Sequence, residues 1–281
     1  MSSLAATDTP SAQAPGTPRA RGRVTLPNVL RSEQTKLWSL RSSRWTLLVA
    51  VIAMAGLGAL VAAVQMSRWG QLSPHDRNTY DSINTAVGGW HLAQLAVGVL
   101  GVLVITGEYS TGMIRSSLMA VPRRLPVLWS KLIVFAVVTF VLMLISSLVS
   151  FFAVQAIVSS HHVQHGLGDP GALRTVIGAA LYQTVLGLLC VGLGGIIRNT
   201  AGGIAAFVGL LFVLPGISAI LPTSVNNAVS PYLPLSAGTT VASHTFDNPN
   251  HLATWTGFAL FCGYAAVAIA AAAVTIMRRD A

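Results

Sequence analysis

Apolar runs of about 20 residues recur along this 281-residue sequence, and they limit the folds open to it more than any other feature. About 20 consecutive apolar residues, wound as an α-helix, cross the hydrocarbon core of a bilayer. A membrane β-barrel would need short segments of alternating polarity, which the sequence lacks. We therefore predict an all-α integral membrane protein with six transmembrane helices, at about 45–66, 87–106, 132–158, 173–197, 201–221 and 252–277. Residues 67–86 are polar and predict a loop, and Pro215-Gly216 is expected to interrupt the fifth span.

The composition supports a membrane protein over a soluble one. Charged residues make up 9% of the chain and the mean hydropathy is +0.67, whereas about a quarter of the residues in a soluble domain are charged. Cys190 and Cys262 both lie inside apolar runs. They indicate small buried side chains, not a disulfide framework or a metal site.

The residues before the first apolar run fall into two segments. Residues 1–26 are rich in Ala, Ser, Thr and Pro, which favours a disordered cytoplasmic tail. No apolar run precedes position 45, so this segment is not a signal peptide. Residues 27–44, within the predicted 27–281 permease domain, place Val29, Leu30, Leu37 and Leu40 on one helical face, with Glu33 among them. The period favours a helix in the membrane interface, in contact with lipid, over a solvated basic linker.

The distribution of basic residues predicts the orientation. With six spans and both termini in the cytoplasm, fourteen Lys and Arg residues lie on the inner side and three on the outer side. The positive-inside rule therefore predicts a multi-pass protein of the cell membrane with cytoplasmic N- and C-termini. Most of the net charge of +9 belongs to this inner face. The chain has no folded basic module of the kind that binds nucleic acid.

The connector between the second and third spans, residues 107–131, concentrates charge in a chain that otherwise has little. It carries Glu108 and four basic residues. We weigh two roles for Glu108: an ion pair with Arg115 or a neighbouring arginine, or holding the connector in a shape that a partner recognises. A short helix before Pro122 would offer a partner one basic and four apolar side chains, namely Arg115, Met113, Ile114, Leu118 and Met119.

Several catalytic and nucleotide-binding motifs are absent from the sequence. It contains no GxxxxGK[ST], HExxH or GxSxG motif, so the chain has no P-loop for ATP. The six spans contain no acidic residue away from their ends, which argues against a carrier with its own ion coupling. We infer that a partner supplies the energy. His161, His162 and His165 could converge on a metal, but their Gly-rich surroundings argue against it, and we predict no metal site.

Glycines are dense in the fourth and fifth spans. They allow helices to approach closely in lipid. Packing within the chain and a dimer seam would explain these glycines equally well. They are Gly187, Gly192, Gly194, Gly195, Gly202 and Gly203.

The connector sequence TGEYSTGMIRSSLMAVPRR closely resembles the first cytoplasmic loop of bacterial type-2 ABC-transporter permeases, especially their actinobacterial branch. Three further segments are similar to that family. They are the helix entry with Glu33, Lys36, Leu37, Arg41, Ser42, Arg44 and Trp45; Tyr232-Leu233-Pro234 with Ala237-Gly238; and the ending Arg278-Arg279-Asp280. The His-rich loop 159–172 departs from the family pattern.

The resemblance implies the membrane subunit of an ATP-driven exporter. Such a chain forms a homodimer or heterodimer with a second permease and binds two copies of a cytoplasmic ATPase. The ATPase binds ATP and Mg, so this chain is not an enzyme and needs no cofactor of its own. By the same resemblance residues 27–44 are an elbow helix, and residues near 110–121 are a coupling helix with Glu108 at its base. Short outer re-entrant helices would include Pro222, Tyr232, Pro234 and Gly238.

Two other functions remain open from the sequence. A membrane anchor or sensor subunit of an ATPase complex would use the same connector without transporting. A self-sufficient carrier is the least supported, because the spans lack charge.

Overall fold

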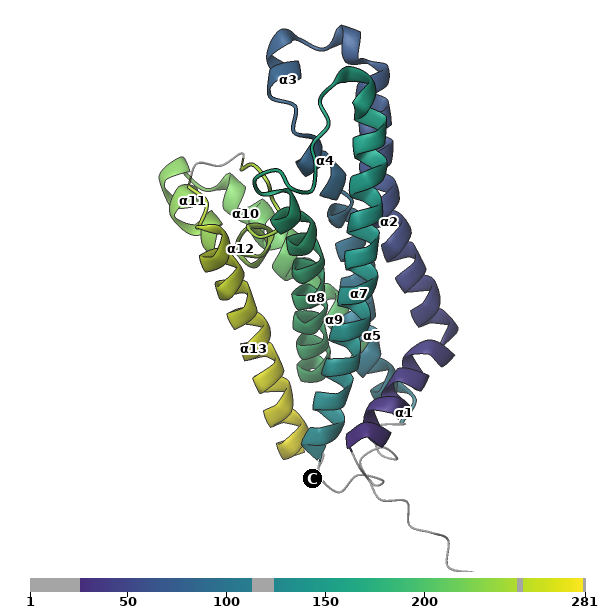
Figure 1. Cartoon of the computed structure of the whole chain (residues 1–281). Helices are drawn as coiled ribbons and strands as arrows, with labels where there is room; N and C mark the ends of the chain where they lie inside the picture. The colour runs from purple at the N-terminus through teal and green to yellow at the C-terminus, as the bar shows by residue number, and fades with distance from the viewer. Residues whose placement is uncertain (1–25, 113–123, 247–249, 280–281) are drawn as a thin grey trace, which may run out of the picture.

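The computed structural model describes residues 26–112, 124–246 and 250–279, and these residues form helices without any strand (Figure 1). Six helical segments among them are long and apolar enough to cross a membrane. This confirms the predicted all-α membrane fold. The six segments are Arg41–Ser67, Ser82–Ser110, Leu128–His161, Ala172–Ile197, Thr200–Ile220 and Thr254–Arg278.

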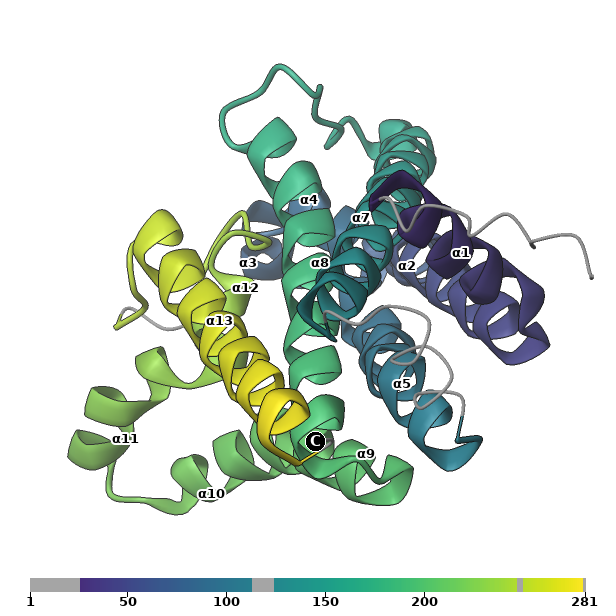
Figure 2. The same cartoon turned by 90° about the horizontal axis from the view of Figure 1, so that it is seen from below.

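The long helices are α2 (Arg41–Ser67), α5 (Trp90–Ser110), α7 (Arg124–Val158), α8 (Ala172–Ile197) and α13 (Thr254–Arg279). Helix α8 lies in the middle and packs against α5, α7 and α13, as the view along the bundle shows (Figure 2). It is the most buried of the six candidate spans. Helix α1 (Leu26–Ser39) lies at one end of the bundle, with the last turn of α5 and the first turns of α7. We call this the α1 end.

Glycines permit the close approach of α8 to its neighbours. A Cβ added at Gly101 of α5 would lie 2.5 Å from the carbonyl oxygen of Gly187 in α8. One added at Gly192 would lie 2.8 Å from the Cβ of Ala268 in α13. Gly187, Gly192, Gly194, Gly195 and Gly203 each face an atom of another helix of the same chain, so packing within the chain accounts for these five glycines.

The segment between the first two spans contains short helices where we expected a loop. They lie at the end opposite to α1, which we call the α3 end (Figure 1), and they are η1 (Trp69–Gln71), α3 (Pro74–Asn78) and α4 (Ser82–Val87). Ser73 caps α3 by accepting a hydrogen bond from the backbone of Asp76 at 3.1 Å. Asp81 caps α4 by accepting from the backbone of Ile83 and Asn84, each at 3.0 Å. These caps satisfy backbone donors that so short a helix leaves free.

The fifth span is irregular before Pro215, not at it as we expected. Helix α9 (Thr200–Val208) runs into the π-helical turn η3 (Gly209–Val213), which continues as α10 (Leu214–Ile220). Pro215 takes the second position of α10, directly after this turn, and has no N–H to donate back into it. The wide turn at η3 thus absorbs the change in helical geometry.

Short helices follow the fifth span, as the family resemblance implied. They are α11 (Thr223–Val229), η4 (Ser230–Tyr232) and α12 (Pro234–Thr239). Pro222 caps α11 and Pro234 opens α12. Gly238 is buried, and a Cβ there would meet Tyr182 and Phe261 at 2.8 and 2.9 Å. Tyr232 is exposed, and its carbonyl oxygen accepts a hydrogen bond from the Tyr264 hydroxyl at 2.7 Å.

The histidine-rich loop makes separate contacts. Helix α7 continues into η2 (Ser159–His161), and His161 stacks on Trp69 with ring centroids 5.2 Å apart. The Nδ1 atom of His165 lies 2.8 Å from the Ser82 hydroxyl. His162 adopts a left-handed backbone (φ 58°) that ends η2.

Candidate functional site

Helix α1 presents one buried face to α7. Pro27 lies in its first turn, where the fixed φ of proline suits a helix start. Val29, Glu33 and Leu37, spaced four residues apart, are buried, and α1 packs on α7. The prediction for Leu40 was wrong. Its backbone is extended (ψ 120°) and it separates α1 from α2, so its side chain is 57% exposed.

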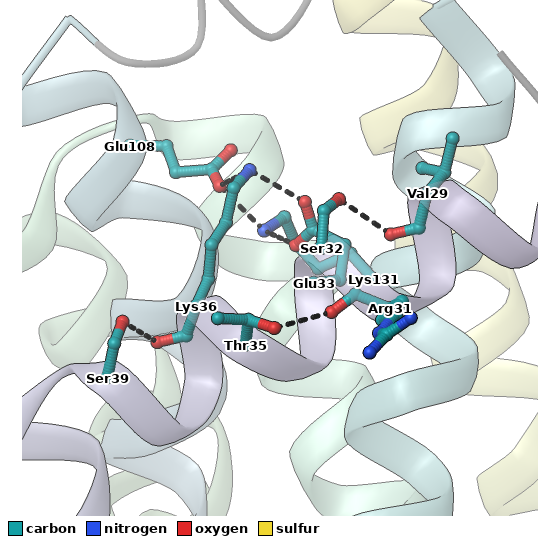
Figure 3. Close-up of polar contacts among 9 residues, drawn as sticks. All are labelled: Val29, Arg31, Ser32, Glu33, Thr35, Lys36, Ser39, Glu108 and Lys131. Carbon is teal, nitrogen blue, oxygen red and sulfur yellow. Dashed lines mark hydrogen bonds and ion pairs between the residues drawn. The ribbon is translucent and has the colours of Figure 1, made fainter. Parts of the chain in front are cut away.

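Four charged side chains meet beside this face, and we call them the ion cluster: Glu33, Lys36, Glu108 and Lys131 (Figure 3). The Nζ atom of Lys131 lies 2.6 Å from Oε2 of Glu33 and 2.9 Å from Oε1 of Glu108. The Nζ atom of Lys36 lies 2.7 Å from Oε1 of Glu33 and 3.0 Å from Oε1 of Glu108. The cluster uses both lysines and both glutamates of the whole sequence.

The ion cluster is mostly withdrawn from solvent. The side chains of Glu33, Glu108 and Lys131 are 5%, 9% and 6% exposed, and that of Lys36 is 29% exposed. Burial opposes the charged form of Lys36, but the hydrogen bonds and charges of Glu33 and Glu108 outweigh it and raise its pKa. Two carboxylates and two ammonium groups compensate one another, so the cluster carries no net charge when all four are ionised. Removing one member would leave an uncompensated buried charge.

The cluster joins three segments that are far apart in sequence. Glu33 and Lys36 belong to α1, Glu108 lies in the last turns of α5, and Lys131 lies in the second turn of α7. The connector runs from α5 to α7, so the two residues from these helices stand at its two ends. Two lysines also lie near the C-terminus of α5, where the helix dipole favours cations. Helix α1 is thereby bonded to both ends of the connector.

The predicted site residues divide into those that meet at the cluster and those that do not. Glu108, Glu33 and Lys36 meet, and Leu37 packs beside them. The described partners of Glu108 are two lysines, not arginines. Arg115 lies outside the described residues, as do the other predicted docking residues Met113, Ile114, Leu118 and Met119.

The remaining predicted residues lie away from the cluster. Arg41 opens α2, and Trp45, one turn later, is 65% exposed. Both project from the start of α2 and, with Arg44 and Leu48, line a shallow surface hollow. The positions of Pro222, Tyr232, Pro234 and Gly238 lie in the short helices beyond the fifth span.

Lys131 is a cluster member that our sequence reasoning counted only among the connector's basic residues. Two signals could have found it. It is one of two lysines among fifteen arginines, and it opens a long apolar run. A lysine in such a position, buried by its helix neighbours, needs a carboxylate partner.

A cavity of about 270 Å³ borders the ion cluster. All four cluster residues line it, between α1 and the start of α2 on one side and α5 and α7 on the other. Its other walls are mostly apolar and include Leu37, Leu103 and Val134. Oε2 of Glu108 is buried and accepts no hydrogen bond from any described residue. The cluster thus has a free acceptor at the base of the connector.

Arg198 makes a second link at the α1 end. It occupies the turn between α8 and α9 with a left-handed backbone (φ 58°). Its guanidinium donates to the carbonyl oxygen of Thr275 in α13 at 2.7 Å. The same group lies 5.1 Å from the ring centroid of Tyr109, next to Glu108 in α5, a cation–π contact. Movement of the end of α5 would therefore also displace α8 and α13 through Arg198.

The chain matches the model of a known protein family. The model of a family described as ABC-2 family transporter protein matches residues 30–216, about two thirds of the chain. The matched region contains α1 from residue 30 onward, the connector and every member of the ion cluster. No curated protein matches the sequence.

Proposed function

This chain belongs to the ABC-2 family of transporter proteins, and we propose that it couples ATP hydrolysis by a separate ATPase subunit to export across the cell membrane. It is a multi-pass membrane permease of an ABC transporter and is not itself an ATPase. Permeases of this family generally work with an ABC ATPase partner. The proposed assembly contains two permease chains, identical or related, and two ATPases that bind ATP and Mg.

The proposal places the α1 end in the cytoplasm. Both termini of the described chain lie at this end (Figure 1). So do most of the basic residues that the structure describes, including Arg31, Lys36, Lys131, Arg198 and Arg278. The positive-inside rule assigns such an end to the cytoplasmic side, where a soluble ATPase can reach the connector.

The single observation that carries the coupling proposal is that the ion cluster bonds both ends of the connector to α1. A partner that pushes on the connector acts on the ends of α5 and α7 that carry Glu108 and Lys131. Both residues bond to α1 through Glu33 and Lys36. Short charge-assisted bonds in a site with little water are stiff. The three segments therefore move together, and a displacement of the connector is transmitted to α1, α5 and α7.

Docking itself is assigned to Arg115 and the apolar residues Met113, Ile114, Leu118 and Met119, on the strength of their types and of the family resemblance. The test is co-purification of the full-length chain with its separately encoded ATPase. Arg115→Glu combined with Met113→Asp should abolish co-purification, because it reverses a charge and adds another in an apolar contact. Arg68→Glu, at the α3 end, is the matched control and should bind as the wild type does.

Unchanged assembly and ATP hydrolysis in the double variant would contradict the docking assignment. A complex that assembles but never moves substrate or changes its rate of ATP hydrolysis with substrate would instead favour the anchor or sensor function.

A further inference from the structure

The start of α2 presents exposed cations and exposed apolar side chains on one side of the helix. Arg41 and Arg44 lie in its first turn, and Trp45 and Leu48 follow at the spacing that places side chains on one helical face. All four are exposed, and together they border the shallow hollow described above. Helix α2 runs along the outside of the bundle (Figure 1). We call these four residues the α2 entry face.

The two arginines of the α2 entry face have no partner among the described residues. Neither guanidinium forms a hydrogen bond or an ion pair there. Glu33 and Glu108, the acidic residues described at the α1 end, are both bonded to lysines. The arginines do not stabilise their own helix either, because a helix dipole disfavours cations at the N-terminus and the first turn of α2 contains no acid. Their charge is therefore available to an anion from outside the chain.

The apolar part of the same side continues along α2. Trp45 is 65% exposed, Leu48 is 44% exposed, and Ile52, one turn further on, is 60% exposed. Helix α2 is long and apolar enough to cross a membrane, so its exposed apolar side contacts hydrocarbon and its first turn lies near the head groups. Tryptophan is typical of the boundary between these two regions. Charge, boundary and hydrocarbon contact thus follow one another in the order found along a phospholipid.

We propose that the α2 entry face binds an anionic phospholipid. Arg41 and Arg44 would hold its phosphate, since guanidinium groups donate paired hydrogen bonds to phosphate oxygens. One acyl chain would lie along Leu48 and Ile52. In a zwitterionic lipid such as phosphatidylcholine the choline cation offsets the phosphate, so the two arginines favour a lipid with net negative charge. A role of these arginines in topology alone requires no preference between the two lipids.

The site uses no member of the ion cluster and no residue of the connector. Failure of the lipid proposal would therefore leave the proposed function intact, and the reverse also holds.

The test uses the full-length protein in dodecyl maltoside micelles and a phosphatidylglycerol whose acyl chains carry bromine, which quenches tryptophan fluorescence on contact. The signal of Trp45 is the difference between the wild type and Trp45→Phe. Phosphatidylcholine with the same brominated chains is the comparison lipid. The Trp45 signal should be quenched at about a 30-fold lower concentration of phosphatidylglycerol than of phosphatidylcholine, because each basic residue near an anionic lipid contributes about fivefold.

Charge-removing variants assign this preference to the two arginines. Arg41→Gln and Arg44→Gln should each reduce it about fivefold, and the double variant should abolish it. Both side chains are exposed, so the melting temperature in lipid-free detergent should stay the same. Arg68→Gln, at the opposite end of α2, is the matched control and should keep the full preference.

Glycerol 3-phosphate distinguishes a lipid from a free phosphate, because it has the anionic group without acyl chains. Added in excess, it should not restore the Trp45 fluorescence that brominated phosphatidylglycerol has quenched. Equal quenching by the two lipids, a preference that survives in the double variant, or displacement by glycerol 3-phosphate would each overturn the proposal.

Discussion

Lys131 is the residue that holds the ion cluster together. Its ammonium group contacts both glutamates at 2.6 and 2.9 Å, and its side chain is only 6% exposed. Lys36 contacts the same two carboxylates but is 29% exposed, so water can replace part of what it supplies. The two lysines therefore differ in how much the fold depends on them.

We expect Lys131→Met to lower the free energy of unfolding by about 3–5 kcal/mol, because it leaves two buried carboxylates with one partially exposed lysine. Lys36→Met should cost clearly less, since solvent reaches its position. Thermal unfolding of the purified variants in one detergent measures this, with Arg44→Gln as an exposed control from the same end. Equal melting temperatures for Lys131→Met and Arg44→Gln would show that the cluster does not stabilise the fold.

Asp81 predicts a dependence on pH at the α3 end. Burial raises its pKa, but the hydrogen bonds from the Asn84 backbone and His244 outweigh this and hold the pKa below its usual 3.8. A lowered pKa gives stability that is complete above the unfolded value and is lost as pH falls through the folded value. Asp81→Asn should therefore destabilise the protein by about 1–3 kcal/mol at pH 5–7.

That difference between wild type and Asp81→Asn should shrink below pH 3.8. Unfolding curves at intervals from pH 7 to pH 3 check it, with Asp76→Asn in exposed helix α3 as the control. A difference that stays constant down to pH 3 would mean that Asp81 is not held ionised by its partners.

Residue-level reasoning from the sequence named three of the four members of the ion cluster, Glu33, Lys36 and Glu108, but did not bring them together. Glu108 stood out as an acid among cations, and Glu33 lay on an otherwise apolar helical face. The pairing of these two glutamates with Lys36 and Lys131 could not be predicted, because it depends on how α1 packs across α5 and α7. Periodicity within one helix does not determine that contact.

At the scale of elements, the approach of α5 and α13 to α8 depends on glycines with little room beside them. A Cβ at Gly101 would lie 2.5 Å from a backbone oxygen, which cannot move aside without moving α8. We expect Gly101→Ala to cost about 1–3 kcal/mol of stability through overpacking. Gly263→Ala of α13, which has no atom within 4 Å of the added Cβ, should be neutral or gain up to about 1 kcal/mol.

Expression yield and thermal unfolding of the two glycine variants in parallel measure this difference. If Gly101→Ala were as stable as Gly263→Ala, α5 and α8 would have to be further apart than the structure places them.

Elements were predictable in proportion to their length. The six spans and α1 follow from apolar length and helical period, which act within one segment. The short helices α3 and α4, of five and six residues, were missed because they are too brief to show a period. The sequence signals for them were the caps Ser73 and Asp81 and the proline at position 74 that opens α3. The irregular turn η3 contains no proline. The prediction that Pro215 breaks the fifth span therefore placed the irregularity a few residues too late.

For the whole molecule, we propose that the ion cluster carries a push on the connector to three helices at once. Glu108 is the cluster member at which an effect on coupling can be told apart from an effect on stability. Glu108→Gln keeps a hydrogen-bond acceptor and a similar shape while removing the charge. Coupling residues of this kind change the coupling free energy by about 0.5–2 kcal/mol. Assembly with the ATPase is assigned to the connector, so it should survive the change.

The most direct measurement is permease-dependent ATP hydrolysis by the reconstituted complex, with the amount of bound ATPase measured in the same sample. Wild type, Glu108→Gln and the exposed control Arg31→Gln are compared. We expect equal ATPase binding in all three and a rate of ATP hydrolysis lowered about 2- to 30-fold in Glu108→Gln alone. Equal rates in all three complexes would contradict this proposal.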